Sequence, residues 1–139
     1  MALETTVERV EGRVPVTVID LDGELDGTNY RQVIDTVAGV YADGGRHLLL
    51  DLTDLEFISS AGLVALHASL RLMQGEPPPD PEFGYAALRA INEEVDRGET
   101  QTNVQLCGTQ EGVQKVLDRT GLAGLFPSHP DRAAAIAAF

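Results

Sequence analysis

The sequence predicts an α/β fold in which a small β-sheet has helices packed against it. Short β-prone runs alternate along the chain with segments whose apolar residues recur at helical spacing. The predicted order is strand, strand, helix, strand, helix, an inserted helix, strand, helix and helix. With 139 residues, 43% of them hydrophobic and 23% charged, the chain suits a single domain, residues 1–139, with a core of its own.

The first two predicted strands form a hairpin. Residues 7–10 and 14–21 are β-prone runs on either side of a short polar turn. Pro15 has no N–H to donate, so it favours an edge position or a nitrogen that points away from the paired strand.

A helix is predicted after this hairpin. Residues 22–27 are rich in turn-forming side chains, and Asp26 or Thr28 can cap the helix that follows. Its apolar stripe consists of Tyr30, Val33, Ile34, Val37, Val40 and Tyr41.

The most informative stretch is the strand-to-helix transition at residues 48–73. The strand at residues 48–52 is expected to be buried on both faces, because its leucines do not alternate with polar residues. Two serines, Ser59 and Ser60, lie where this strand gives way to a helix. A serine hydroxyl there can cap the helix or carry a phosphate, since a helix N-terminus offers free N–H groups and a positive dipole end. The apolar face of the helix consists of Leu63, Leu66, Leu70 and Met73.

The second half of the chain begins with a proline-rich spacer. Residues 75–81 hold four prolines and cannot form helix or ladder, and a weakly amphipathic helix is predicted at residues 85–97. A strand at residues 104–108 then precedes a helix that Thr109 caps and Gly121 ends. A final helix is predicted at residues 133–138, preceded by a capping box formed by Ser128 and Asp131. The tyrosines and phenylalanines are expected to lie in the core.

Two strings in this sequence resemble the signature of STAS domains, which are named for sulfate transporters and bacterial anti-sigma factor antagonists. The strings are Gly23-Glu24-Leu25-Asp26 and Leu48-Leu49-Leu50-Asp51-Leu52 followed by Phe57-Ile58-Ser59-Ser60-Ala61-Gly62-Leu63. The resemblance implies a small mixed sheet whose central strand leads into the helix that carries a regulatory serine. It places Ser60 at the phosphorylated position and Ser59 where Asp is most usual, and it makes residues 75–99 look like an insertion. The partner-binding residues that it implies are Asp22, Glu24, Asp26, Ser59, Ser60, Ala61 and Gly62.

The resemblance also implies a function, that of an anti-sigma factor antagonist. Such a domain binds an anti-sigma factor, often itself a serine kinase, when unphosphorylated; phosphorylation at Ser60 ends the binding and a phosphatase restores it. The alternatives are a STAS subunit of a stressosome-like or lipid-transport ABC assembly, or a STAS domain that binds a small ligand or nucleotide. The sequence leaves open whether the chain forms a homodimer.

Composition narrows the remaining classes of function. The formal net charge of -12 disfavours direct binding to nucleic acid, and no apolar run approaches the length of a membrane span. A lone, apolar-flanked cysteine, Cys107, indicates a reduced, cytoplasmic compartment.

No enzyme signature is present, and neither a cofactor nor a metal site is expected. The sequence lacks a Gly-x-Ser-x-Gly elbow, a Walker loop and a dinucleotide-binding turn. A phospho-aspartate receiver centred on Asp51 would need an acidic pair after its first strand and a lysine after a later strand. Leu21 separates Asp20 from Asp22, and the single lysine, Lys115, falls inside a predicted helix. The histidines have no metal-ligand spacing, and they are His47, His67 and His129.

Overall fold

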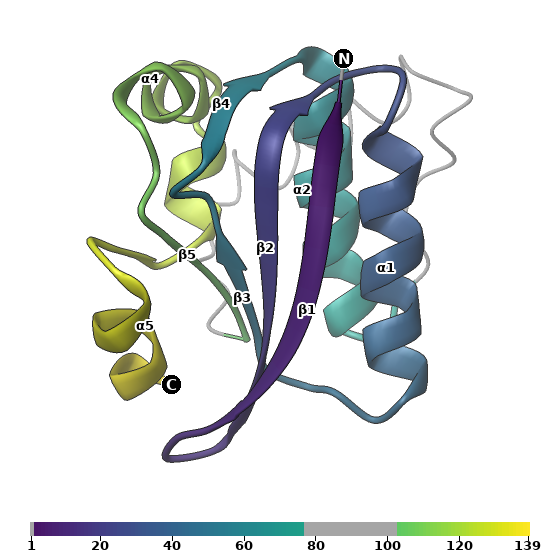
Figure 1. The fold of residues 1–139 in the computed structure, drawn as a ribbon, viewed down its shortest axis with the longest axis vertical. Coiled ribbons are helices and arrows are strands. Elements are labelled where there is room, and N and C mark those ends of the chain that lie inside the picture. The colour runs from purple at the N-terminus through teal and green to yellow at the C-terminus, as the bar shows by residue number, and fades with distance from the viewer. Residues whose placement is uncertain (1, 77–102) are drawn as a thin grey trace.

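A computed structural model of the chain describes residues 2–76 and 103–139 (Figure 1). The described strands are β1 (Leu3–Glu11), β2 (Pro15–Leu25), β3 (Leu48–Asp51), β4 (Leu55–Ile58), β5 (Val104–Cys107) and β6 (Ser128–His129). The helices are α1 (Tyr30–Ala42), α2 (Ser60–Met73), α4 (Glu111–Thr120) and α5 (Arg132–Ala138), with a short 3-10 helix, η1 (Leu122–Leu125).

The sheet is mixed, as expected. Its order is β1-β2-β3-β5-β6, with β1 antiparallel to β2 and the other pairs parallel. Strands β3 and β4 pair with β2 one after the other, because residues 52–54 interrupt what would otherwise be one long strand. Strand β2 is therefore the axis along which the first half of the domain is assembled.

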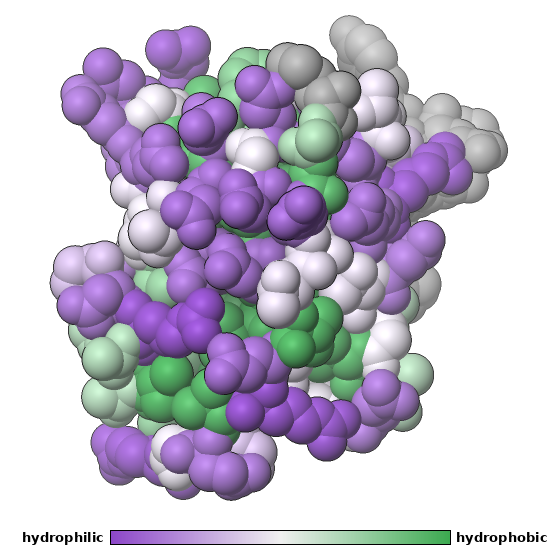
Figure 2. All heavy atoms as spheres, viewed as in Figure 1, coloured by the Kyte–Doolittle hydropathy of each residue, from purple (hydrophilic) through white to green (hydrophobic). Residues whose placement is uncertain are grey.

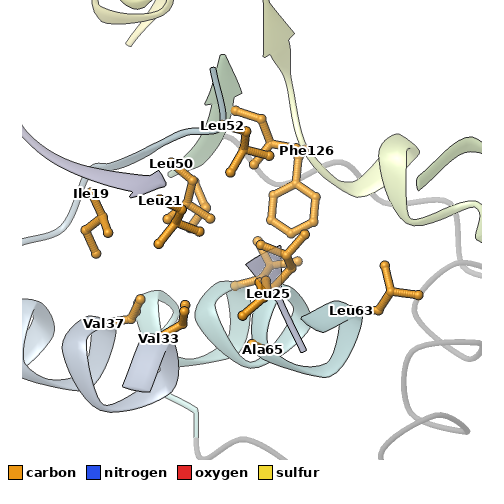
Figure 3. Close-up of a cluster of buried hydrophobic side chains, with 14 of the residues drawn as sticks. Ile19, Leu21, Leu25, Val33, Val37, Leu50, Leu52, Leu63, Ala65 and Phe126 are labelled. Atoms are coloured by element: carbon orange, nitrogen blue, oxygen red, sulfur yellow. The ribbon is translucent and has the colours of Figure 1, made fainter. Parts of the chain in front are cut away.

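The main core lies between the sheet and the pair of helices α1 and α2, which run side by side (Figure 1). Figure 3 shows leucine and isoleucine side chains of β2 and β3 facing Val33 and Val37 of α1. On the opposite face, Leu49 belongs to a smaller cluster beneath α5, together with Val16, Val18, Cys107 and Ala135. The prediction that the strand at residues 48–52 is buried on both faces is thus confirmed.

Strand β2 extends further than predicted. Residues 22–25 continue the strand to Leu25 instead of forming a turn, and Gly23, with φ 120°, accommodates a shift in register between β2 and β4. Asp-Gly is typical of turns and of bulges alike, so its local composition did not reveal that a fourth strand pairs here. Strand β1 is also longer than predicted and begins at Leu3, while Pro15 begins β2 at the hairpin end, as its missing N–H requires.

Three predicted helix caps were wrong by one to three residues. Helix α1 follows Asn29, since Asp26 closes its own turn by accepting hydrogen bonds from the N–H (2.8 Å) and hydroxyl (2.6 Å) of Thr28. Helix α4 follows Gln110 rather than Thr109, and Gly121, with φ 77°, ends that helix as predicted. Before α5 the strand β6 takes up Ser128, so the cap is made by Asp131 alone, which accepts from the Ala134 N–H at 2.8 Å.

Most of the predicted insertion, including the helix at residues 85–97, lies outside the described residues. The described residues on either side of it are joined, because the Asn103 side-chain amide donates to the Met73 carbonyl at 2.9 Å. No helix within residues 2–76 or 103–139 combines the length and the apolar character needed to cross a membrane.

Candidate functional site

The two serines lie at the N-terminus of α2, beside the carboxyl ends of β2 and β4. Ser59 has an extended backbone, its N–H donates to the Leu25 carbonyl at 2.9 Å, and its hydroxyl accepts from the Gly62 N–H at 3.3 Å. Ser59 is therefore the N-cap of the helix and ties the helix to the end of β2. Capping is a sufficient explanation for this serine.

Ser60 is the first residue of α2, and its side chain is exposed. Within the described part of the chain its hydroxyl forms no hydrogen bond, so it is available to a modifying enzyme. The first turn of a helix carries free N–H groups and the positive end of the dipole, which favour a negative group. The chemistry that suits this hydroxyl is the acceptance of a phosphate.

Gly62 has a reason within the fold for being glycine. A Cβ at this position would lie 2.5 Å from Ile58 Cγ1, 2.9 Å from Leu25 Cγ and 3.1 Å from the Leu25 carbonyl oxygen. The first turn of α2 therefore packs directly on the ends of β2 and β4, and Gly62 is buried there, while Ala61 is partly exposed. Gly62 fixes the position of the serines from behind, so its predicted role as a direct partner contact stays a prediction.

The three predicted carboxylates stand at the end of β2. Asp22 is exposed, and Glu24 and Asp26 are partly buried. Hydrogen bonds from the hydroxyl and then the N–H of Thr28 hold the pKa of Asp26 below its usual value. Asn29 secures the same loop, since its side chain accepts from the Asp26 N–H at 3.0 Å and donates to the Glu24 carbonyl at 2.8 Å. The carboxylates thus sit on an ordered loop next to Leu25, which holds Ser59.

Phe57 was missed as a candidate surface residue. The expectation that all phenylalanines belong to the core was wrong here, because Phe57 is 46% exposed on β4, opposite Glu24 of β2. Leu55 and Ile58 of the same strand are buried in the main core, whereas Glu56 and Phe57 between them are exposed, so the Phe57 ring lies on the solvent side of β4. The acidic residues Asp54 and Glu56, which precede Phe57, were the available signal that this strand borders solvent.

Asp51 belongs to a separate charge cluster on the α5 side of the sheet. The Nε and Nη2 atoms of Arg132 donate to its carboxylate at 3.2 and 3.0 Å, and Nη1 of the same arginine donates to Glu8 at 2.9 Å. Burial opposes ionisation of Asp51, but hydrogen bonds from Thr53 and Arg132 outweigh it and hold the pKa of Asp51 below its usual value. Asp51 therefore anchors the last helix and does not present the free carboxylate of a receiver.

Cys107 and the histidines contribute no chemistry to the serine junction. Cys107 is fully buried, and burial together with the nearby Asp51 raises its pKa to about 12, so the thiol is unreactive. Among the described residues no group of three or more His, Cys, Asp or Glu side chains could hold a metal ion. The histidines lie apart, with His67 buried in α2, His129 bonded to the Gln105 side chain at 2.7 Å and His47 edge-on to Phe139.

Comparison with known proteins agrees with this geometry. A model of the STAS domain matches residues 8–75, a span that ends just after α2 and includes both serines. In sequence the chain is 26% identical over 140 residues to the "Putative anti-sigma factor antagonist BtrV" of Bordetella bronchiseptica, covering 99% of this chain and 95% of that one.

Two solved structures share the fold. An anti-sigma factor antagonist from Mycobacterium paratuberculosis is 23% identical with a TM-score of 0.70, over 99% of this chain and 93% of that chain. The phosphorylated form of the Bacillus cell fate determinant SpoIIAA is 17% identical with a TM-score of 0.58, over 94% of this chain and 96% of that chain. At these identities the structures support the fold described above.

Proposed function

This chain belongs to the STAS domain family, and from that premise we propose that it is an anti-sigma factor antagonist switched by phosphorylation of Ser60. The unmodified domain binds an anti-sigma factor, and the phosphorylated domain does not. The protein acts by binding rather than by catalysis, and a phosphatase resets it. The BtrV relative, which matches nearly the whole chain and bears the same functional description, supports this assignment.

The observation that carries the proposal is the division of labour between the two serines. Ser59 is occupied as the helix cap, whereas the hydroxyl of Ser60 is exposed on the same turn. A kinase that needs an accessible hydroxyl therefore has a single suitable acceptor at this junction. Phosphate there adds about -1.5 to -2 charge at pH 7.

The phosphate is expected to change the surface and leave the backbone in place. The Ser59 N–H bond to Leu25 and the close packing of Gly62 fix the first turn of α2. A negative group at a helix N-terminus is favourable by up to about 1 kcal/mol, so the fold has no reason to open. The partner responds instead, because it would have to desolvate a doubly charged group where it previously met a hydroxyl.

The surface around Ser60 indicates what the partner presents. Phe57 is an exposed aromatic side chain of the kind that anchors protein interfaces. Beside it stand carboxylates at the end of β2 and on β4, among them Asp22, Glu24 and Glu56. We therefore expect the partner to offer an apolar pocket rimmed by basic side chains.

The test uses the full chain with a serine-kinase-type anti-sigma factor as partner. With kinase and ATP, intact-mass measurement should show one added phosphate, which Ser60→Ala abolishes and Ser59→Ala, the matched control, retains. Ser60→Asp should weaken partner binding at least tenfold, about 1.4 kcal/mol, with an unchanged unfolding midpoint. A phosphate mapped to Ser59, or binding indifferent to Ser60→Asp, would contradict the proposed switch.

A further inference from the structure

Strand β1 forms an open edge of the sheet. It is the outermost strand on its side among those described, and it pairs with β2 in an unbroken antiparallel register over all nine of its residues. Exposed edges in soluble monomers are usually kept short or blunted by charged side chains, above all lysine, by proline or by a bulge. Strand β1 contains neither lysine nor proline, and its register with β2 shows no bulge. It does carry four charged residues, Glu4, Glu8, Arg9 and Glu11, and Glu8 is paired with Arg132 of its own chain.

The backbone alternation shows which groups this edge presents. The Glu24 N–H donates to the Ala2 carbonyl and the Gly12 N–H to the Val14 carbonyl, both at 3.2 Å and both in the register of the β1–β2 pair. Even-numbered residues of β1 therefore exchange hydrogen bonds with β2. The N–H and C=O groups directed outward belong to the odd-numbered residues, which are Leu3, Thr5, Val7, Arg9 and Glu11.

Val7 lies at the middle of the strand and is 49% exposed, one of the two large hydrophobic side chains described as exposed. Figure 2 shows apolar atoms near the middle of this strand and a second apolar patch between α5 and the β1–β2 hairpin, on a face that is largely hydrophilic elsewhere. We propose that a second copy of this chain pairs antiparallel with β1, with the two Val7 residues opposite each other on a two-fold axis. The two sheets then join into one.

Charge selects this register over its neighbours. With Val7 on the axis, all nine residues pair, and Arg9 faces Thr5 while Glu8 faces Thr6. A register centred on Thr6 would set Glu4 against Glu8, and one centred on Glu8 would set that residue against itself, arrangements that destabilise a strand pair. Both of these registers move the second copy by two residues along the strand. A move by an odd number of residues would turn the second sheet over, so the registers centred on Thr6 and Glu8 are the relevant competitors.

Glu8 is the acidic residue nearest the proposed axis. The two copies of Glu8 would be diagonal neighbours across the strand pair, about 7–8 Å apart. Each is already bound to Arg132 of its own chain, at 2.9 Å, which offsets their repulsion. The Arg132–Glu8 ion pair that holds α5 therefore also makes it easier for two copies of β1 to pair.

The proposed dimer leaves both serine junctions open. The junction adjoins the end of β2 that lies beside Ala2, at the N-terminal end of β1. Antiparallel pairing places those ends at opposite ends of the strand pair. Dimer formation is therefore independent of whether Ser60 is phosphorylated, and Ser60→Asp should leave the dissociation constant of the dimer unchanged.

Register-specific crosslinking of the full chain tests the proposal. Oxidised Val7→Cys should give a disulfide-linked dimer, because directly opposite residues of a hydrogen-bonded pair have Cα atoms about 5.5 Å apart, within disulfide range. Thr5→Cys is the matched control: its counterpart in the second copy lies four residues along the strand, roughly 13 Å away, so it should stay monomeric under the same conditions. Cys107 is fully buried and does not compete.

Sedimentation equilibrium of the unmodified chain supplies the second measurement. We expect a concentration-dependent dimer, and Val7→Lys should raise its dissociation constant at least tenfold while circular dichroism shows an unchanged fold. A wild-type chain that stays monomeric into the millimolar range overturns the proposal. Crosslinking of Thr5→Cys as efficient as that of Val7→Cys also overturns it, since the register would then be wrong.

Discussion

Replacing Gly62 by alanine tests whether the serine-bearing turn is held by close packing. An added Cβ would meet Ile58 Cγ1 at 2.5 Å, Leu25 Cγ at 2.9 Å and the Leu25 carbonyl oxygen at 3.1 Å. Carbon atoms in favourable contact lie about 3.5–4.0 Å apart, so the side chains or the helix must move. The carbonyl belongs to the strand end that also binds Ser59, which limits how far the helix can shift.

Two opposing effects set the magnitude. Alanine is favoured over glycine in a helix by up to about 1 kcal/mol, whereas overpacking a core contact costs about 1–3 kcal/mol. Because three contacts are too short at once, we expect Gly62→Ala to lower the free energy of unfolding by about 1–2 kcal/mol. For a domain of this length that corresponds to a melting temperature lower by roughly 3–8 °C.

Gly39→Ala is the matched control. Gly39 is exposed inside α1, and a Cβ there would meet no atom within 4 Å, so only the propensity term remains and the variant should be more stable by up to about 1 kcal/mol. Thermal and urea unfolding followed by circular dichroism measure both. Equal stability of the two variants would show that the turn at Gly62 has room to spare and that the packing argument is wrong.

Two further predictions concern the rest of the domain. Arg132→Gln should destabilise the fold by about 1–2 kcal/mol, a charged hydrogen-bond value discounted because this side chain is 35% exposed. The pKa of Asp51 is lower in the folded state, so the stability that the ionised carboxylate contributes is present above the unfolded pKa and is lost as pH falls through the folded pKa. Urea midpoints measured between pH 7 and 3 should therefore fall more steeply for the wild type than for Arg132→Gln. Parallel curves would argue against the ion pair. Replacing residues 76–99 by a short Gly/Ser bridge should leave a cooperatively unfolding domain, because the Asn103 amide binds Met73; loss of the thermal transition would mean that the replaced segment is part of the core.

The elements with strong local patterns were predictable from sequence. The leucine run of β3 and the helical spacing from Leu63 identify a buried strand and a packed helix whatever surrounds them. Gly23 was misassigned because a turn and a bulge use the same residues, and only pairing with β4 decides between them. The caps failed for a similar reason, since neighbouring polar residues compete for the same N–H groups.

The site was predictable only in part. The resemblance located Ser60, but the reason that Ser59 is not equivalent appears in its bonds to Gly62 and Leu25. The exposure of Phe57 depends on what packs against the outer face of β4, and the Arg132–Asp51 pair joins residues 81 positions apart. Neither leaves a signal in any short window of sequence.

The hydrogen bond from Asn103 to Met73 has a consequence for how such a domain can diverge. It closes the connection between α2 and β5 at its base, so the helix and strand on either side keep their places whatever length of chain lies between. The entropy of closing a flexible loop grows only with the logarithm of its length, about 0.6 kcal/mol for each doubling. Residues can therefore be gained or lost there at little thermodynamic penalty, and the connection between α2 and β5 is a natural place to graft a reporter or affinity peptide without disturbing the proposed serine switch.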